Sequence, residues 1–130
     1  MILDAGRGDR TGFAREFDVC VIGAGPAGIT LALRLAAAGA TVALMEAGGF
    51  EISAESQDSY AGAVVGRDYY PLDTARLRFL GGSSNHWGGM CRPLDASDFA
   101  AHSWLPLSGW PIGPADLAPC PAETPAVPRP

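Results

Sequence analysis

The first half of the chain alternates two short apolar runs with one amphipathic stretch. Residues 17–22 form an apolar run rich in β-branched side chains that stops at Gly23, which is typical of a buried strand. Apolar positions then recur at helical spacing over residues 26–38, between a starting Pro and Gly39, which predicts a helix. A second apolar run over residues 40–45 predicts another strand. We therefore expect a strand, helix, strand unit with parallel strands.

The periodicity weakens along the rest of the chain. Residues 50–73 are polar and carry tyrosines, which predicts a loop or an irregular helix that leaves the sheet. A glycine-rich cluster occupies residues 81–89. Proline is frequent from residue 106 onward, so we expect this tail to form neither helix nor sheet.

Composition and charge exclude several classes of protein. The chain has 130 residues and a net charge of −5, so it is one domain at most and lacks the basic patch that nucleic-acid binders need. Cys20, Cys91 and Cys120 form no Cys-x-x-Cys pair, which argues against a structural metal site. Cys20 is expected to be a small core residue. No apolar run reaches the roughly 18 residues of a membrane span, and the start lacks the apolar centre of a secretory signal, so we expect a cytoplasmic protein.

The glycine pattern G-x-G-x-x-G lies between the first predicted strand and the predicted helix. Gly23 permits a sharp turn, Gly25 lets the backbone approach a pyrophosphate, and Gly28 lets the helix pack close to the strand. Glu46 ends the second predicted strand about 20 residues further on, where a carboxylate reaches ribose hydroxyls. The alternative is a tight turn with a surface glutamate. The predicted dinucleotide-binding residues are Gly23, Ala24, Gly25, Pro26, Ala27, Gly28 and Glu46.

The first glycine pattern does not distinguish NAD from FAD, whereas the second glycine cluster favours a flavin. Its small residues let a flat ring or a phosphate approach the backbone, and its polar side chains offer hydrogen bonds to an isoalloxazine edge. The alternative is a flexible turn in which Trp87 covers the core. The candidate residues are Gly81, Gly82, Ser83, Ser84, Asn85, His86 and Trp87.

Two stretches resemble the glucose-methanol-choline (GMC) oxidoreductases, a family of FAD enzymes. They are FDVCVIGAGPAGITLALRLAAAGATVALMEAGG, residues 17–49, and LRFLGGSSNHWGGMCRPLD, residues 77–95. The resemblance implies an FAD-dependent oxidoreductase that moves a hydride from an alcohol or sugar CH–OH group to the flavin. It also implies that the three glycines of the first pattern hold the FAD pyrophosphate, Glu46 holds the adenosine ribose, and residues 82–85 lie beside the flavin ring.

Three roles are open to His86. In the family branch that includes pyranose oxidases, a His followed by Trp is joined covalently to the flavin, and His86-Trp87 resembles that pair. In the second role the histidine is hydrogen-bonded near the flavin without a covalent link, and in the third it faces solvent.

These patterns together predict an α/β fold, namely a Rossmann-like FAD-binding βαβ unit with parallel strands, an incomplete sheet and an irregular Pro-rich tail. We expect a lead segment (1–16), a partial FAD/NAD(P)-binding domain (17–105) and a tail (106–130). The resemblance implies that the acid/base pair and the substrate domain lie further downstream, so no catalytic residue is assigned here.

The end of the chain departs from the family pattern. Asp116-Leu117 resembles the start of a family helix, but a Pro-rich sequence follows, which suggests truncation or a frameshift and an isolated chain without activity. The alternative functions are a non-catalytic product and an NAD-binding module acting with another chain. Flavin absorbance of the purified protein distinguishes them.

Overall fold

The computed structural model describes residues 1–5, 14–90 and 92–119 of the chain. It divides into two compact units, Met1–Gly89 and Met90–Pro130, which are described separately. Two of the three cysteines, Cys91 and Cys120, lie outside the described residues, as does the tail from residue 120 onward. The predicted boundaries of the lead segment, the domain and the tail stay predictions.

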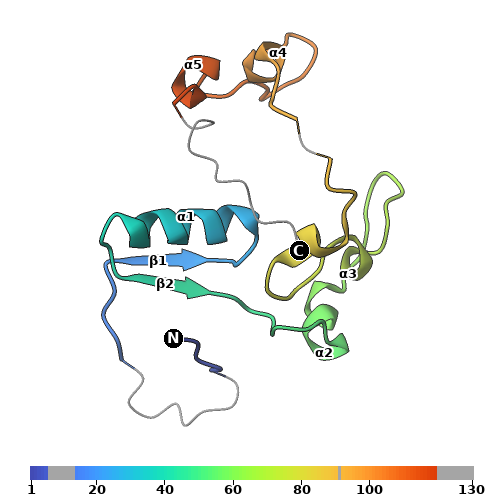
Figure 1. The fold of residues 1–130 in the computed structure, drawn as a ribbon. Helices are drawn as coiled ribbons and strands as arrows, with labels where there is room; N and C mark the ends of the chain where they lie inside the picture. Colours follow the sequence, from blue (N-terminus) through green and yellow to red (C-terminus); the bar gives the residue numbers. More distant parts are fainter. Residues whose placement is uncertain (6–13, 91, 120–130) are drawn as a thin grey trace. The chain divides into compact units, whose positions relative to one another are not determined.

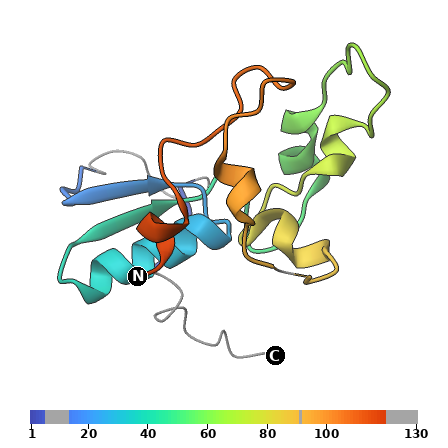
Figure 2. The same cartoon turned by 90° about the horizontal axis from the view of Figure 1, so that it is seen from above.

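The first unit contains the predicted strand, helix, strand arrangement. Strand β1 (Val19–Ile22) is followed by helix α1 (Pro26–Ala37) and strand β2 (Val42–Met45). The two strands are parallel, with Val19 opposite Val42 and Ile22 opposite Met45. Helix α1 runs along one face of this pair (Figures 1 and 2). The predicted Rossmann-like α/β unit with an incomplete parallel sheet is confirmed.

A side-chain contact joins the beginnings of the two strands. The carboxylate of Asp18 accepts hydrogen bonds from the hydroxyl and the backbone N–H of Thr41, at 2.6 and 2.8 Å. Both bonds favour the charged carboxylate and so lower the pKa of Asp18, and the bond from the Thr41 hydroxyl lowers it more than the bond from the N–H. This contact holds the beginnings of β1 and β2 together, at the end of the strands away from the glycine turn.

The helix packs on the strands through small residues. Val21 and Ala32 are buried, and Ala24 is almost completely inaccessible. A Cβ atom on Gly28 would lie 1.9 Å from the carbonyl oxygen of Gly23, so only glycine allows this close approach of α1 to the end of β1. The core of this unit therefore lies between α1 and the sheet, next to the glycine turn.

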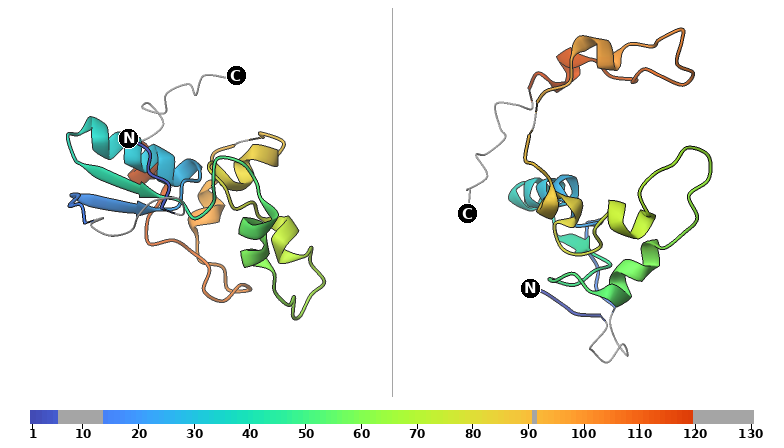
Figure 3. Two further views of the ribbon diagram at one scale, coloured as in Figure 1. Left: turned by 90° about the horizontal axis from the view of Figure 1, so that it is seen from below. Right: turned by 90° about the vertical axis from the view of Figure 1, so that its right-hand side faces the viewer.

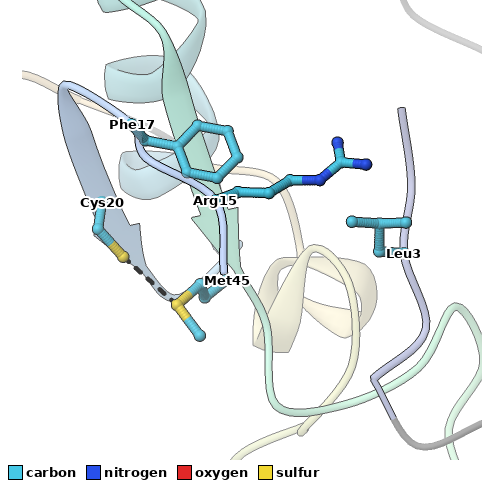
Figure 4. A pocket seen from close by; sticks show the side chains of 5 residues that line it. All are labelled: Leu3, Arg15, Phe17, Cys20 and Met45. Atoms are coloured by element: carbon cyan, nitrogen blue, oxygen red, sulfur yellow. Dashed lines mark hydrogen bonds between the residues drawn. The ribbon is translucent and has the colours of Figure 1, made fainter. Parts of the chain in front are cut away.

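The opposite face of the sheet is largely exposed. Cys20, Ile22 and Met45 are exposed, and the thiol of Cys20 lies 3.3 Å from the sulfur of Met45 (Figure 4). The two sulfur residues, together with Leu3, Arg15 and Phe17, line a shallow pocket of about 340 Å³. The prediction that Cys20 is a core residue is wrong, because its side chain points away from the face that α1 covers.

Short helical turns follow β2. They are α2 (Ala54–Gln57), the 3₁₀ turn η1 (Asp58–Tyr60) and α3 (Leu72–Ala75), which lie side by side (Figure 3). Ser53 caps α2 by accepting a hydrogen bond from the N–H of Ser56 at 3.2 Å. The 3₁₀ turn η2 (Gly82–His86) ends the helical elements of this unit. An irregular, partly helical segment was expected in residues 50–73, and this is what is observed.

The second unit contains the single-turn helices α4 (Ala96–Phe99) and α5 (Pro114–Leu117). Phe99 is buried, and its carbonyl accepts a hydrogen bond from the N–H of Trp110 at 3.1 Å. Helix α5 corrects the expectation that the tail forms no helix. Pro114 occupies the first turn, where a missing N–H costs nothing, and Asp116 accepts a hydrogen bond from the N–H of Gly113 at 2.7 Å.

Candidate functional site

The turn between β1 and α1 is open on the side where a ligand would approach. Gly23 has φ +97°, a conformation that favours glycine, and its N–H donates to the carbonyl of Met45 at 2.7 Å. Apart from its chain neighbours, no described atom lies within 4 Å of the place that a Gly25 Cβ would take. Among the described residues, no side chain caps the start of α1, and the first turn of this helix contains no acidic residue. The N–H groups at the start of α1 thus suit a phosphate.

Glu46 lies directly beside this turn, at the end of β2. One carboxylate oxygen accepts from the N–H of Ala24 at 2.8 Å, and the other accepts from the N–H groups of Ala47 and Gly48, at 2.8 and 3.0 Å. Partial burial alone would raise the pKa of Glu46, but these three N–H groups and the charge of Arg78 together lower it. The side chain is therefore an ionised acceptor next to the glycine turn, as binding of ribose hydroxyls requires.

The second glycine cluster contacts the first. The N–H of Gly81 donates to the carbonyl of Ala24 at 2.8 Å, and the N–H of Leu80 donates to the carbonyl of Gly49 at 2.9 Å. The sequence predicted a ligand role for each glycine segment separately. The structure brings the two segments together at the carboxyl end of the parallel strands, where ligands of open α/β sheets bind.

A pocket of about 340 Å³ lies where the two glycine segments meet. It is lined by Gly25 and Pro26 from the turn, and by residues 81–84 and Trp87 from the cluster. Trp87 is half exposed, and its neighbour His86 is exposed at the end of η2. Glycine backbone on both sides and an indole at the edge suit a flat ring or a phosphate group. The arrangement fits a dinucleotide whose pyrophosphate approaches the start of α1.

The polar side chains of the cluster hold its backbone in place. Ser83 accepts from the N–H of Leu77 at 3.0 Å, and Ser84 donates to the carbonyl of Gly81 at 2.6 Å. The amide of Asn85 donates to the carbonyls of Leu80 and Gly82, at 3.0 and 2.8 Å. These side chains shape the turn in the structure, and their predicted hydrogen bonds to a flavin stay a prediction.

Three residues near the site were not singled out by the sequence. Arg78 and Ser56 exchange hydrogen bonds, and Gln57 accepts from the N–H of Arg78 at 3.0 Å. All three side chains are half-buried. One sequence signal could have identified Arg78: it lies between the apolar residues Leu77 and Phe79, just before the glycine cluster. Arginine is seldom buried without a partner, so a partly buried arginine at this position indicates hydrogen-bond partners nearby.

Two further observations concern the described residues. None of the helices in residues 1–5, 14–90 and 92–119 has the length and apolar character needed to cross a membrane. The same residues contain no group of three or more His, Cys, Asp or Glu side chains arranged to hold a metal ion.

Comparison with known proteins identifies the cofactor. A family model described as FAD dependent oxidoreductase matches residues 18–117, which include the whole βαβ unit and both glycine segments. No curated protein and no solved structure matches the chain. The family match decides for FAD over NAD as the dinucleotide. Because the matched residues make up most of the chain, it belongs to the FAD dependent oxidoreductase family.

Proposed function

We propose that this chain is the FAD-binding part of a GMC-type oxidoreductase acting on a CH–OH group of an alcohol or sugar. The observation that carries the proposal is the hydrogen bond between Gly81 and Ala24, which joins a dinucleotide-binding turn to the GMC-like glycine cluster. The substrate class rests on the resemblance of residues 77–95 to that family, so it is an argument by analogy.

The residues of the chain bind and orient the cofactor in this proposal. The N–H groups at the start of α1 hold the pyrophosphate, and Glu46 accepts hydrogen bonds from the adenosine ribose. Residues 82–85 lie beside the flavin, and residues 17–105 make up the FAD-binding domain. The bound flavin supplies the hydride acceptor. The proposal assigns no proton-transferring side chain within this chain.

We propose that the flavin is held without a covalent bond, with His86 hydrogen-bonded near it. His86 is exposed at the end of η2, next to Trp87, which lines the pocket. Acid precipitation of the FAD-loaded chain is expected to leave the yellow colour in the supernatant. Colour retained in the protein pellet, and lost in His86→Ala, would show the covalent bond instead.

The substrate class is tested by flavin reduction in the FAD-loaded protein under anaerobic conditions. A panel of sugars, primary alcohols and amino acids is added, and bleaching of the flavin absorbance is followed. GMC-type chemistry predicts no bleaching by amino acids and, because the proposal assigns no proton-transferring side chain to this chain, only slow bleaching by a sugar or an alcohol. Bleaching by amino acids alone would refute the CH–OH assignment and leave the family membership standing. As a control, dithionite shows that the bound flavin is reducible.

A further inference from the structure

One side chain of α2 holds the segment that leads into the second glycine cluster. The amide nitrogen of Gln57 donates to the carbonyls of Asp73 and Arg76, and its oxygen accepts from the N–H of Arg78 at 3.0 Å. Gln57 is half-buried, so these bonds are partly shielded from water. This side chain therefore fixes the backbone over residues 73–78 relative to α2.

Ser56, the neighbour of Gln57, holds Arg78 at both its main chain and its side chain. The guanidinium of Arg78 donates to the hydroxyl and the carbonyl of Ser56, at 3.1 and 3.4 Å. In return the hydroxyl of Ser56 donates to the carbonyl of Arg78 at 3.0 Å. A half-buried cation needs such partners, because removing charge from water is unfavourable without compensation. The guanidinium is thus held in one place.

Arg78 also borders the turn that holds Glu46. A Cβ atom on Gly48 would lie 2.1 Å from the carbonyl oxygen of Arg78, so the two backbones are in close contact. The N–H of Gly48 in turn donates to the carboxylate of Glu46 at 3.0 Å. The backbone N–H bonds from Gly48, Ala24 and Ala47 lower the pKa of Glu46 most, and the positive charge of Arg78 lowers it further by a smaller amount.

We propose that Arg78, held by Ser56 and Gln57, is a positioning residue whose charge and whose backbone contact with Gly48 hold the Glu46 carboxylate where it can accept the adenosine ribose of FAD. This inference rests on the proposed ribose role of Glu46. Arg78 acts through its charge and through its backbone contact with Gly48, and it needs no contact with the cofactor. Just after Arg78, the N–H groups of Leu80 and Gly81 donate to the carbonyls of Gly49 and Ala24, which joins the two glycine segments next to this residue.

The first test measures Glu46 itself in the full 130-residue chain without FAD. Carboxyl-carbon NMR gives the pKa of Glu46 in the wild type, Arg78→Gln, Arg78→Lys and the control Arg76→Gln, which removes an exposed charge from the same segment. Arg78→Gln is expected to raise the pKa of Glu46, whereas Arg78→Lys and Arg76→Gln leave it lowered. An unchanged pKa in Arg78→Gln overturns the inference.

A second variant covers the case in which Arg78→Gln does not fold. Ser56→Ala keeps the positive charge but removes the hydroxyl that holds the guanidinium. It is expected to raise the pKa of Glu46 by a smaller amount than loss of the charge. A pKa that does not respond to Ser56→Ala in a folded chain contradicts the role assigned to Ser56.

The second readout is FAD affinity from quenching of flavin fluorescence. Arg78→Gln is expected to weaken FAD binding about twofold to fivefold, the usual size of one partly exposed charge interaction, and Arg78→Lys to restore most of it. If Glu46→Gln leaves FAD affinity unchanged, the proposed ribose role fails. If Glu46→Gln weakens binding but Arg78→Gln does not, the positioning role of Arg78 fails and the ribose role stands.

Discussion

The two glycine-rich segments of the site hold their shapes by different means. In residues 23–28 the backbone is shaped by the lack of side chains, since Gly23 has a positive φ and Gly28 leaves room for the Gly23 carbonyl. In residues 81–86 positive φ at Gly81 and Gly82 is combined with hydrogen bonds from Ser84 and Asn85 to nearby carbonyls. The first segment keeps its shape because glycine leaves room for close backbone contacts, and the second keeps its shape through side-chain hydrogen bonds. The two segments should therefore respond differently to substitution.

The largest effect is expected at Gly28, where no side chain fits between α1 and the end of β1. Gly28→Ala places a methyl group 1.9 Å from the Gly23 carbonyl, so α1 must shift away from β1. We expect a loss of about 1–3 kcal/mol in the free energy of unfolding, together with loss of FAD binding. Chemical denaturation followed by circular dichroism measures the first effect.

Gly88, which follows the second segment in the glycine cluster of residues 81–89, provides the matched control for Gly28→Ala. A Cβ on Gly88 meets no described atom within 4 Å, so Gly88→Ala should leave the free energy of unfolding nearly unchanged. Equal losses in the two variants would show that the first segment is not held by its lack of side chains.

The next largest effect is expected on FAD affinity when Glu46, the hydrogen-bond acceptor beside the first glycine segment, is replaced. Glu46→Ala removes a carboxylate that accepts three backbone N–H bonds and that we assign to the ribose. Loss of a charge-assisted acceptor should weaken FAD binding by roughly 1.5–3 kcal/mol. Equilibrium dialysis against FAD measures the change. The exposed Glu51→Ala serves as the control, and equal FAD retention in both variants would remove the ribose role.

Lowering the pH should reproduce part of the Glu46 effect. Because folding lowers the pKa of Glu46, its contribution to stability is complete above the pKa of an unfolded glutamate, about 4.3. That contribution is lost as the pH falls through the lower folded value. Thermal denaturation of the wild type and Glu46→Gln should therefore differ at neutral pH and converge in acid. A difference that grows toward low pH would contradict the direction of this shift.

The smallest effect is expected in the second segment, whose shape depends on side-chain hydrogen bonds such as those of Asn85. Asn85→Ala removes the hydrogen bonds to the carbonyls of Leu80 and Gly82. Each hydrogen bond contributes about 0.5–1.5 kcal/mol, and the contribution is at the lower end here because the side chain is exposed. We expect weaker FAD binding with little change in the unfolding of the βαβ unit. Hydrogen exchange of the amides in η2 should become faster. Unchanged exchange there would mean that Asn85 does not hold the turn.

The sequence predicted those parts of the fold that depend on local patterns. The β1–α1–β2 unit follows from two apolar runs, one helical period and the glycines between them, and its helix begins at Pro26 as expected. The strands proved shorter than the apolar runs, because pairing begins only at Val19 and Val42. Cys20 was misplaced because an apolar run does not say which face of a sheet is covered.

The parts that the sequence did not predict depend on contacts between distant segments. Gln57 and Arg78 lie 21 residues apart, and no local period indicates that their bond forms. The bond between Gly81 and Ala24 joins two motifs that the sequence presents separately. Helix α5 contradicts the expectation from proline frequency, because Pro114 stands in the first turn of a helix, where proline is tolerated; only the family resemblance at Asp116-Leu117 indicated a helix there.

The central claim is that the two glycine segments form one FAD site, and a fluorescence titration of the purified chain with FAD tests it most directly. Gly25→Val fills the open space at the start of α1, whereas Ala37→Val places the same valine side chain at the exposed far end of that helix. We predict saturable FAD binding in the wild type and in Ala37→Val, and loss of binding in Gly25→Val with its circular dichroism spectrum retained. FAD binding that survives Gly25→Val unchanged would contradict the account.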